Sequence, residues 1–311
     1  MLMLTMLVKI INLHTLKQRL IWLLTALYFA IATTGFAAQE VHSAATNYAN
    51  SPIVKNDFEW QVMLDLSLVS TPQILTDVKQ TEAIDYVHLG LLLDISYKGF
   101  FLQSNSRRSS TIIGSGEIGY QLSVQNDWEL DLILKTYIDG FDPKEIIRDQ
   151  KQSIPQLEGL HERGFTDGIA LRYSRFFDNS IAYVDLAAAL TDKNKQGDYT
   201  SGIIIDSFYS YLIPYRNWDI YLGAGLTYYD KSLINYYYGI DVDEVTSARA
   251  LHNAKAAFRA QLEVYVQYPL SKNWSFNSSV TQTFYSNSIK HSPLVDENKL
   301  TQLMIGVLYV F

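Results

Sequence analysis

The sequence predicts an all-β protein: a single antiparallel transmembrane β-barrel of about 12 strands, preceded by an N-terminal signal peptide. Three observations lead to this prediction. Hydrophobic side chains alternate with a period of two, the alternating segments are mostly 11–13 residues long, and the connections between them alternate between short and long. Strands of soluble proteins are typically about five or six residues long, whereas a tilted membrane-crossing strand needs about nine to eleven.

The composition excludes several classes of protein. The chain has no cysteine and a formal net charge of −7, and 13% of its residues are aromatic. A disulfide framework, a thiolate metal site and a cysteine nucleophile are therefore excluded, and the acidic balance argues against nucleic acid as a partner. The aromatic content argues against a disordered chain.

The first residues have the layout of a secretory signal peptide. Residues 1–19 carry three bases and no acid, and the uncharged segment 20–38 follows. Gly35 and Ala37 stand at the positions before cleavage, so we predict a signal peptide over 1–37, a short periplasmic segment over 38–56 and a barrel over 57–311 in the cell outer membrane. The alternative is an uncleaved membrane anchor, since about 19 apolar residues suffice to span a bilayer.

Twelve segments show the alternation of strands with two different environments. In the first, Trp60, Leu64 and Leu68 lie on one face and Glu59 and Asp65 on the other. The predicted strands cover residues 58–69, 84–96, 99–105, 112–124, 127–138, 165–176, 181–191, 201–212, 217–229, 256–268, 273–285 and 299–311.

The connections also distinguish a membrane barrel from a β-sandwich. Short turns at 97–98, 125–126 and 177–180 alternate with longer segments such as 139–164 and 230–255. Outer-membrane barrels have short periplasmic turns and longer external loops, and an even strand number places both barrel ends in the periplasm. Residues 241–252 predict a short helix over the external mouth.

Tryptophan provides an independent indication of the membrane boundary. All four Trp residues beyond the signal peptide fall at the beginnings of odd-numbered strands and on the apolar face: Trp60, Trp128, Trp218 and Trp274. Amphipathic aromatic side chains collect where hydrocarbon meets headgroups, so these residues predict an interface girdle on the periplasmic side. We expect Tyr137, Tyr228 and Tyr285 at the opposite rim. The alternative is a general preference of aromatic residues for strands.

The polar faces predict a charged lumen. Its predicted acids are Glu59, Asp65, Asp94, Glu117, Glu129, Asp131, Asp185, Asp206, Asp219 and Glu263, and its predicted bases are Lys135, Arg172 and Arg259. Isolated buried charges are strongly unfavourable, so these groups require water, counter-ions or ionic partners. Two interpretations stay open: a pathway that favours cations or small polar solutes, and a paired interior that conducts nothing.

The chain contains no phosphate loop of the form Gly-x-x-x-x-Gly-Lys-Ser/Thr, no His-Glu-x-x-His and no Gly-x-Ser-x-Gly. No catalytic, cofactor-binding or metal-binding residue is predicted. Asp241, Asp243 and Glu244 lack the glycine and terminal glutamate of a calcium loop. A rim hydrolase that uses His88 or His161 is the remaining enzymatic hypothesis.

The last third of the chain carries a recognisable order of motifs. These are Gly223-Ala-Gly-Leu-Thr-Tyr-Tyr229, Tyr237-Tyr-Gly-Ile240, Lys272-Asn-Trp274, Ser292-Pro-Leu-Val295 and Gly306-Val-Leu-Tyr-Val-Phe311. In this order they resemble the MipA/OmpV family, the MltA-interacting outer-membrane proteins, most clearly over 216–311. The alternation that ends at Tyr309 and Phe311 is also similar to the C-terminal insertion signal of outer-membrane barrels.

The resemblance implies a non-enzymatic envelope protein without a cofactor. It implies a scaffold that links a murein hydrolase to a murein polymerase, and contacts with outer-membrane lipid, lipopolysaccharide and the barrel-insertion machinery. The alternative functions are a small diffusion channel for cationic or polar solutes and, secondly, the rim hydrolase. The predicted periplasmic turns are short, so a scaffold has little protein surface on that side.

Overall fold

The computed structural model describes residues 58–80, 83–104, 116–194 and 196–311. The predicted signal peptide over 1–37 and the segment 38–56 lie outside the described residues. Within the described part, no helix is long and apolar enough to cross a membrane.

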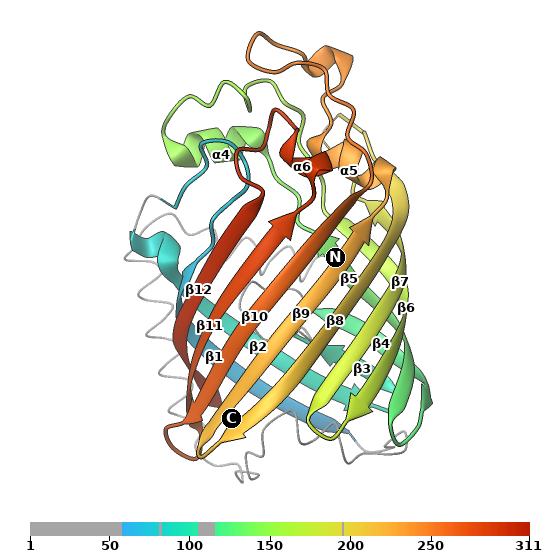
Figure 1. Cartoon of the computed structure of the whole chain (residues 1–311), viewed down its shortest axis with the longest axis vertical. Helices are drawn as coiled ribbons and strands as arrows, with labels where there is room; N and C mark the ends of the chain where they lie inside the picture. The colour runs from blue at the N-terminus through green and yellow to red at the C-terminus, as the bar shows by residue number, and fades with distance from the viewer. Residues whose placement is uncertain (1–57, 81–82, 105–115, 195) are drawn as a thin grey trace. The chain divides into compact units, whose positions relative to one another are not determined.

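Twelve antiparallel strands form a closed barrel in which each strand pairs with the next one along the chain and β1 pairs with β12 (Figure 1). Closure leaves no sheet edge, as a barrel in hydrocarbon requires. The strands are β1 (Glu59–Ser70), β2 (Val87–Tyr97), β3 (Phe100–Gln103), β4 (Glu117–Val124), β5 (Trp128–Ile138), β6 (Thr166–Phe177), β7 (Ser180–Thr191), β8 (Ser201–Tyr215), β9 (Trp218–Tyr229), β10 (Ala257–Pro269), β11 (Trp274–Tyr285) and β12 (Lys299–Val310).

The two faces of the wall follow the alternation in the sequence. In β1, the Leu68 residue is 55% exposed, whereas its neighbour Ser67 is 3% exposed. Large apolar side chains of all twelve strands point outward in this way, and the opposite positions face the interior. The predicted all-β barrel is therefore confirmed, including its strand number and antiparallel order.

Connections at one end are tight turns and those at the other end are long, as predicted (Figure 1). In the β2–β3 turn, Lys98 and Gly99 have φ angles of 49° and 85°. Two positive φ angles are typical of the two-residue turns that fit the twist of a hairpin. The long-loop end carries η1 (Ala83–Tyr86), α4 (Pro143–Gln150), α5 (Lys231–Tyr238), η3 (Val242–Glu244) and α6 (Asn287–Lys290).

Two of the strand boundaries predicted within the described residues differ from the observed ones by three residues. β2 begins at Val87 instead of residue 84, because residues 84–86 belong to the 3-10 helix η1. β8 continues to Tyr215 although Pro214 lacks an N–H. Pro214 pairs with Asp219 of β9, while the ladder to β7 already ends at the Ser180–Tyr211 pair. The missing donor therefore faces a side of β8 where no ladder bond is required.

The helix expected within 241–252 is only the 3-10 turn η3, and the α-helix in this loop, α5, precedes it. The Asp230 side chain explains where α5 begins, because its Oδ1 accepts a hydrogen bond from the Leu233 N–H at 3.1 Å. Its Oδ2 accepts from the Ile203 N–H of β8 at 2.8 Å, so the same carboxylate joins the helix to the barrel wall.

Candidate functional site: the barrel interior and its loop cap

The interior holds most of the charged residues that the sequence places there. Asp65, Glu117, Asp131, Asp185, Asp206, Glu263 and Arg172 are buried. Asp94, Glu129, Asp219, Lys135 and Arg259 are half-buried, and Glu59 is exposed at the short-turn end of β1. Side chains from strands that are not neighbours meet inside the barrel, and they form two separate clusters.

The larger cluster is centred on Arg172 of β6. Its Nη1 donates to Glu117 Oε1 of β4 at 2.6 Å, and its Nε donates to Asp185 Oδ1 of β7 at 2.7 Å. Two further bonds, from Nη2, reach Glu117 Oε2 at 3.1 Å and Asp185 Oδ2 at 3.0 Å. The guanidinium thus forms a bidentate pair with each of two carboxylates, the geometry that makes arginine ion pairs strong.

The same cluster continues around the wall through Lys135 of β5. Its Nζ lies 2.6 Å from Asp185 Oδ2 and 3.3 Å from Asp206 Oδ2 of β8. Thr227 of β9 donates to Asp206 Oδ1 at 2.7 Å, and Arg259 of β10 donates to the Thr227 hydroxyl at 3.3 Å. We call this chain of contacts, from Glu117 to Arg259, the Arg172 network.

The smaller cluster surrounds Asp65 on the opposite part of the wall. Its carboxylate accepts from the Ser67 hydroxyl and, at 2.8 Å, from Asn277 Nδ2 of β11. Asn277 and Ser67 both lie opposite Gly306 of β12 in the ladder, and a Cβ there would come within 2.7 Å of Ser67 Oγ. Glycine at 306 therefore lets side chains from strands on either side meet across it.

The long-loop mouth of the barrel is filled by packed loops. Segments 71–80, 139–165, 230–256 and 286–298 share an apolar core, and we call them the loop cap. The loop residues of that core are Ile74, Leu75, Ile154, Leu157, Leu160, Leu233, Ile234, Ile240, Ala254, Ile289, Leu294 and Val295.

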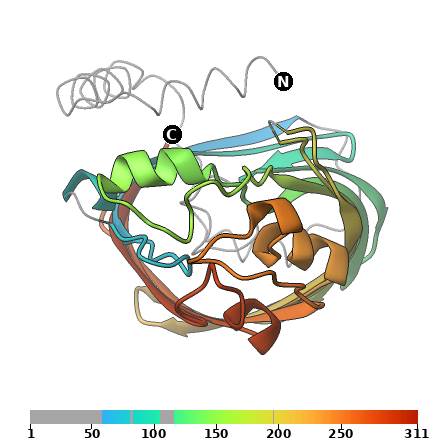
Figure 2. The same ribbon diagram turned by 90° about the horizontal axis from the view of Figure 1, so that it is seen from above.

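The core of the loop cap is continuous with inward-facing strand residues, namely Ile133, Ala170, Ala187, Ala189, Ile204, Tyr229 and Ala257. Figure 2, a view from above, shows the orange segment that contains α5 within the ring of strands. Apolar side chains therefore fill the part of the interior nearest the long-loop end. The Arg172 network lies beside them on β5, where Ile133 is placed between Asp131 and Lys135.

A buried ion pair holds the loops of the cap together. Arg163 Nη2 lies 2.9 Å from Glu244 Oε2, and Glu244 also accepts from the His161 and Asp241 N–H groups. Burial opposes ionisation of Glu244, but the hydrogen bond and charge of Arg163 outweigh it and hold the pKa of this carboxyl below its usual value. Arg249 is fully buried and donates to the carbonyl oxygens of Glu244, Gln156 and Glu158.

The histidines considered for a hydrolase do not form a catalytic pair in the described residues. Ser67 lies opposite His88 in the β1–β2 ladder, but its hydroxyl donates to Asp65, and His88 Nε2 is buried without a hydrogen-bond partner. A nucleophile–base hydrogen bond is the usual signature of such a site. His161 faces carboxylates, with Nδ1 3.5 Å from Asp198 and Nε2 3.6 Å from Asp243.

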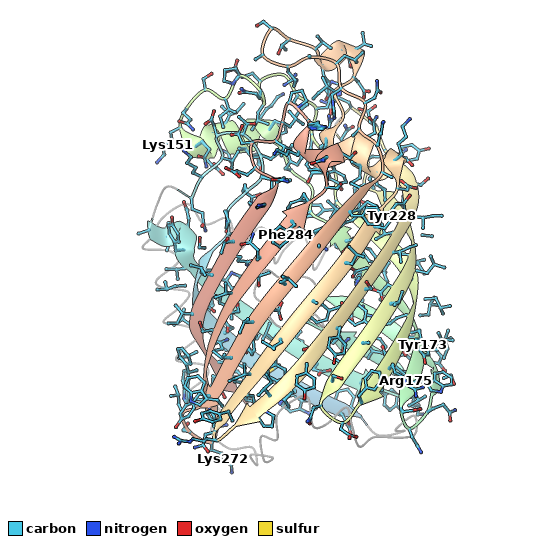
Figure 3. The ribbon with its side chains drawn as sticks, in the orientation of Figure 1. Lys151, Tyr173, Arg175, Tyr228, Lys272 and Phe284 are labelled. Atoms are coloured by element: carbon cyan, nitrogen blue, oxygen red, sulfur yellow. The ribbon has the colours of Figure 1, made fainter. Side chains whose placement is uncertain are left out.

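The four Trp residues lie at the short-turn end and on the outward face. Three of them contact aromatic rings of the next strand: Trp128 with Tyr173, Trp218 with Tyr268, and Trp274 with Tyr309. Trp218 also contacts Phe276 of β11, two strands away. Trp60 is exposed on β1. Figure 3 shows Tyr173 and Arg175 near this end and Lys272 in a turn at its edge, with Tyr228 and Phe284 nearer the loops. Tyr309 contacts Phe311, whose N–H donates to the Val62 carbonyl at 3.1 Å.

Two expected rim tyrosines face inward instead. Tyr137 lies against Asp185, with 3.3 Å between its hydroxyl and Oδ2, and Tyr285 packs against the apolar core of the loop cap. Both have the parity of the inward positions of their strands, so the alternation itself corrects this expectation. Sequence reasoning also missed Thr227, Asn277 and the Arg163–Glu244 pair, because neutral polar residues and loop ion pairs carry no periodic signal.

A model of one protein family, described as MltA-interacting protein MipA, matches residues 76–311. Outer membrane protein OmpV of Vibrio cholerae is 25% identical over 182 residues, which cover 57% of this chain and 65% of OmpV, just under two thirds of its length. The 24 kDa outer membrane protein of Pasteurella multocida is 22% identical over 245 residues, which cover 78% of this chain and 88% of that protein.

Solved structures of porins are similar at the level of the barrel. The NanC porin is 7% identical with a TM-score of 0.36, over 80% of this chain and 98% of that chain. The KdgM porin in complex with disordered oligogalacturonate is 10% identical with a TM-score of 0.36, over 81% and 99%.

Proposed function

The chain belongs to the family of the MltA-interacting protein MipA and is an outer-membrane β-barrel, and from this premise we propose that it is a non-enzymatic structural and interaction protein of the envelope. The family description suggests a partner of the MltA type. We propose that this partner is a murein hydrolase on the periplasmic side and that the barrel links it to a murein-synthesising enzyme.

One observation favours an interaction protein over an open diffusion channel. The loop cap packs its apolar core onto the inward-facing residues of β5 to β10, and Arg172 bonds to carboxylates on both sides of its own strand. An open channel needs a continuous wet path, and in this proposal the loop cap and the Arg172 network leave too little room for one. The surface left for a partner is then the outer wall and the two ends.

A site-specific photo-crosslinking experiment tests the proposal. A photoreactive amino acid replaces Asp178 in the β6–β7 turn or Lys272 in the β10–β11 turn, both exposed at the short-turn end. We expect irradiation of intact envelopes to join these positions to a murein hydrolase. The matched control places the same amino acid at Val242, which is 82% exposed in the loop cap at the other end. No hydrolase adduct at either turn, or an equal yield at Val242, would contradict the proposal.

A cation pathway is the second candidate, and an unsatisfied interior acid favours it. Glu129 and Asp131 both face inward on β5, and Asp131 Oδ1 is buried without a hydrogen-bond partner among the described residues. A buried carboxylate oxygen in this state attracts water or a cation. In this second proposal the predicted acids of the lumen select cations or small polar solutes.

The proposal also covers the outward-facing aromatic residues and the signal peptide. We assign Trp60, Trp128, Trp218 and Trp274 to an interface girdle on the periplasmic side. Ring contacts with neighbouring strands support this assignment for Trp128, Trp218 and Trp274. We assign Tyr309 and Phe311 to the signal for the barrel-insertion machinery, and residues 1–37 to a cleaved signal peptide. Lipopolysaccharide and lipid are the expected surroundings of the outward face.

A further inference from the structure

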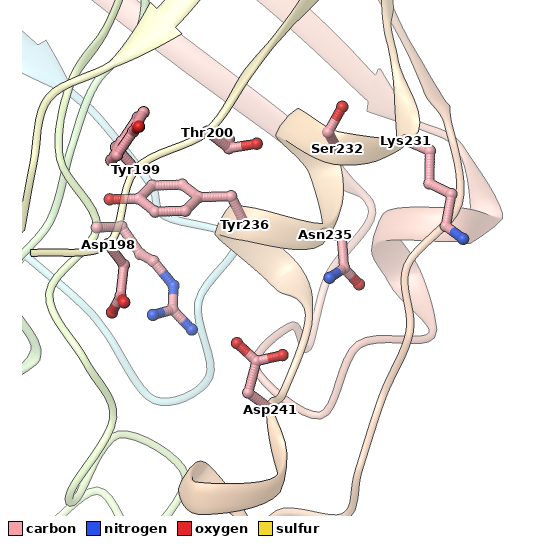
Figure 4. A pocket seen from close by; sticks show the side chains of 9 residues that line it. Asp198, Tyr199, Thr200, Lys231, Ser232, Asn235, Tyr236 and Asp241 are labelled. Atoms are coloured by element: carbon pink, nitrogen blue, oxygen red, sulfur yellow. The ribbon is translucent and has the colours of Figure 1, made fainter.

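A pocket of about 420 Å³ opens at the long-loop end, away from the interior network. One wall is the β7–β8 loop with Asp198, Tyr199 and Thr200, and the other is α5 with Lys231, Ser232, Asn235 and Tyr236 (Figure 4). Arg163 and Asp241 complete the lining. Figure 4 shows Asp198, Tyr199 and Tyr236 on one side of the pocket and Lys231 on the other.

The pocket is held in shape by contacts outside it. Leu233, Ile234 and Tyr237 bury the opposite side of α5. The Tyr236 hydroxyl accepts from the Gly164 N–H at 2.8 Å, and Asn194 Nδ2 donates to Asp198 Oδ2 at 3.0 Å. Such a preformed pocket loses less conformational entropy when a ligand binds than a mobile loop would.

Several polar groups of the lining have capacity left for a ligand. Arg163 is 5% exposed, and its Nε is buried without a hydrogen-bond partner. Asn235 Oδ1 already accepts from the Ala254 N–H at 2.9 Å, so its amide nitrogen is the group that remains for a ligand. The Tyr236 hydroxyl accepts a bond from Gly164 and keeps its own hydrogen to donate.

The charges of the lining favour a ligand that is not an anion. The Arg163 guanidinium is paired with Glu244, 2.9 Å away, which leaves Lys231 as one positive charge against the carboxylates of Asp198 and Asp241. This balance disfavours phosphate and acidic sugars. A protonated amine has two carboxylates available to it, and charge-assisted hydrogen bonds are about twice as strong as neutral ones.

We propose that this pocket binds an amino sugar. Tyr199 is 59% exposed, and Lys193 Nζ lies over one face of its ring, 5.2 Å from the ring centre. Arg163 lies likewise over one face of Tyr236, at 5.7 Å, so each tyrosine has its other face against which the C–H face of a pyranose packs. The hydroxyls of such a ring pair with Arg163 Nε and the Asn235 amide, and its ammonium group pairs with Asp198 or Asp241. An aromatic surface beside a few placed polar groups is the usual composition of a small-molecule site. This proposal does not depend on the murein-enzyme partnership.

Saturation-transfer NMR and titration calorimetry test the site on the full chain in a detergent that has no sugar headgroup. The probes are glucosamine, glucose and glucuronate, which share a ring and differ in charge. We expect the tightest binding for glucosamine, weaker binding for glucose and none for glucuronate. Tyr199→Ala and Asp198→Asn should each weaken glucosamine binding about tenfold or more.

Two matched variants control for the site. Asp243→Asn removes an exposed acid that lies two residues after Asp241 and does not line the pocket. Tyr215→Ala removes an exposed tyrosine at the other end of β8. Both should bind glucosamine as the unsubstituted protein does. The proposal is overturned if glucosamine does not bind, if glucuronate binds at least as tightly, or if Tyr199→Ala and Asp198→Asn leave binding unchanged. Far-ultraviolet circular dichroism verifies that each variant keeps its barrel.

Discussion

Arg172 provides the positive charge that two buried carboxylates of the barrel interior share. It is 4% exposed and bonds to Glu117 and Asp185 from two strands that do not adjoin each other. Its loss would leave two buried carboxylates without their shared cation. Breaking a buried ion pair by removing one partner is strongly unfavourable, whereas an exposed pair contributes little.

We therefore expect Arg172→Ala to lower the free energy of unfolding by about 3–5 kcal/mol. Urea unfolding in lipid vesicles, followed by tryptophan fluorescence, measures it. Arg175→Ala is the control, since the exposed Arg175 side chain near the end of β6 pairs at 2.7 Å with Asp127 of the β4–β5 turn, and its loss should cost less than about 1 kcal/mol. Equal losses in the two variants would show that the Arg172 network is not a stabilising unit.

Glu244 makes the loop cap sensitive to acid. Its pKa in the folded protein lies below the usual value because Arg163 outweighs the effect of burial. A lowered carboxyl pKa contributes stability that is complete above the unfolded-state value, about 4.3, and that is lost as the pH falls through the folded-state value.

Hydrogen exchange at a series of pH values tests this sign. Protection factors of amides in η3 and α5 should be constant near neutral pH and should fall below about pH 4. Glu244→Gln should lower them at neutral pH and remove most of this dependence. Glu145→Gln, at an exposed residue of α4 that lies 3.8 Å from Arg148, should change neither. Parallel curves for Glu244→Gln and the unsubstituted protein would refute the role of Glu244.

At the residue scale, the sequence indicates the face of a side chain but not its partner. Alternation alone places Glu117, Arg172 and Asp185 inward. It does not show that they lie at one height, because height depends on strand tilt and register. Tyr137 faces inward because its parity in β5, shared with Lys135, sets its face, whereas nearness to a strand end does not.

At the scale of elements, strands were easier to predict than helices. A strand that faces lipid on one side carries alternation over its whole length, so ten of the twelve predicted starts lie within one residue of the observed ones. The exceptions are β2, which η1 shortens, and β4, whose predicted start falls in a segment outside the described residues. α4 and α5 have only eight residues each, too few for a clear helical period.

The Asp230 carboxylate should decide whether α5 keeps its place. Asp230→Ala removes the N-cap of α5 and the bond to Ile203 of β8. We expect a loss of about 1 kcal/mol in local stability and faster hydrogen exchange across α5. Asp142→Ala, which removes the cap of α4, is the matched control and should affect α4 alone. Unchanged exchange in α5 would show that packing of Leu233 and Ile234 suffices to hold the helix.

For the whole molecule, the loop cap and the Arg172 network together predict a barrel without steady conductance. Planar-bilayer recording of the purified protein measures this property, with an open porin as positive control. Steady cation-selective openings that disappear in the variant Glu129→Gln, Asp131→Asn, Glu263→Gln would instead establish the pathway through the interior acids. The positions of Asp131 and Glu263 inside the wall make that triple variant a direct test.

The pairing of β1 with β12 has a consequence for biogenesis. The ladder from Met63–Val310 to Ser70–Leu303 joins the strands that are farthest apart in the chain. Until β12 has been synthesised and delivered, β1 has only one neighbour, and the sheet exposes two unsatisfied borders to any chaperone or to another copy. A truncation that removes β12 should therefore abolish assembly outright, whereas an epitope tag inserted beside Val242 should leave it intact.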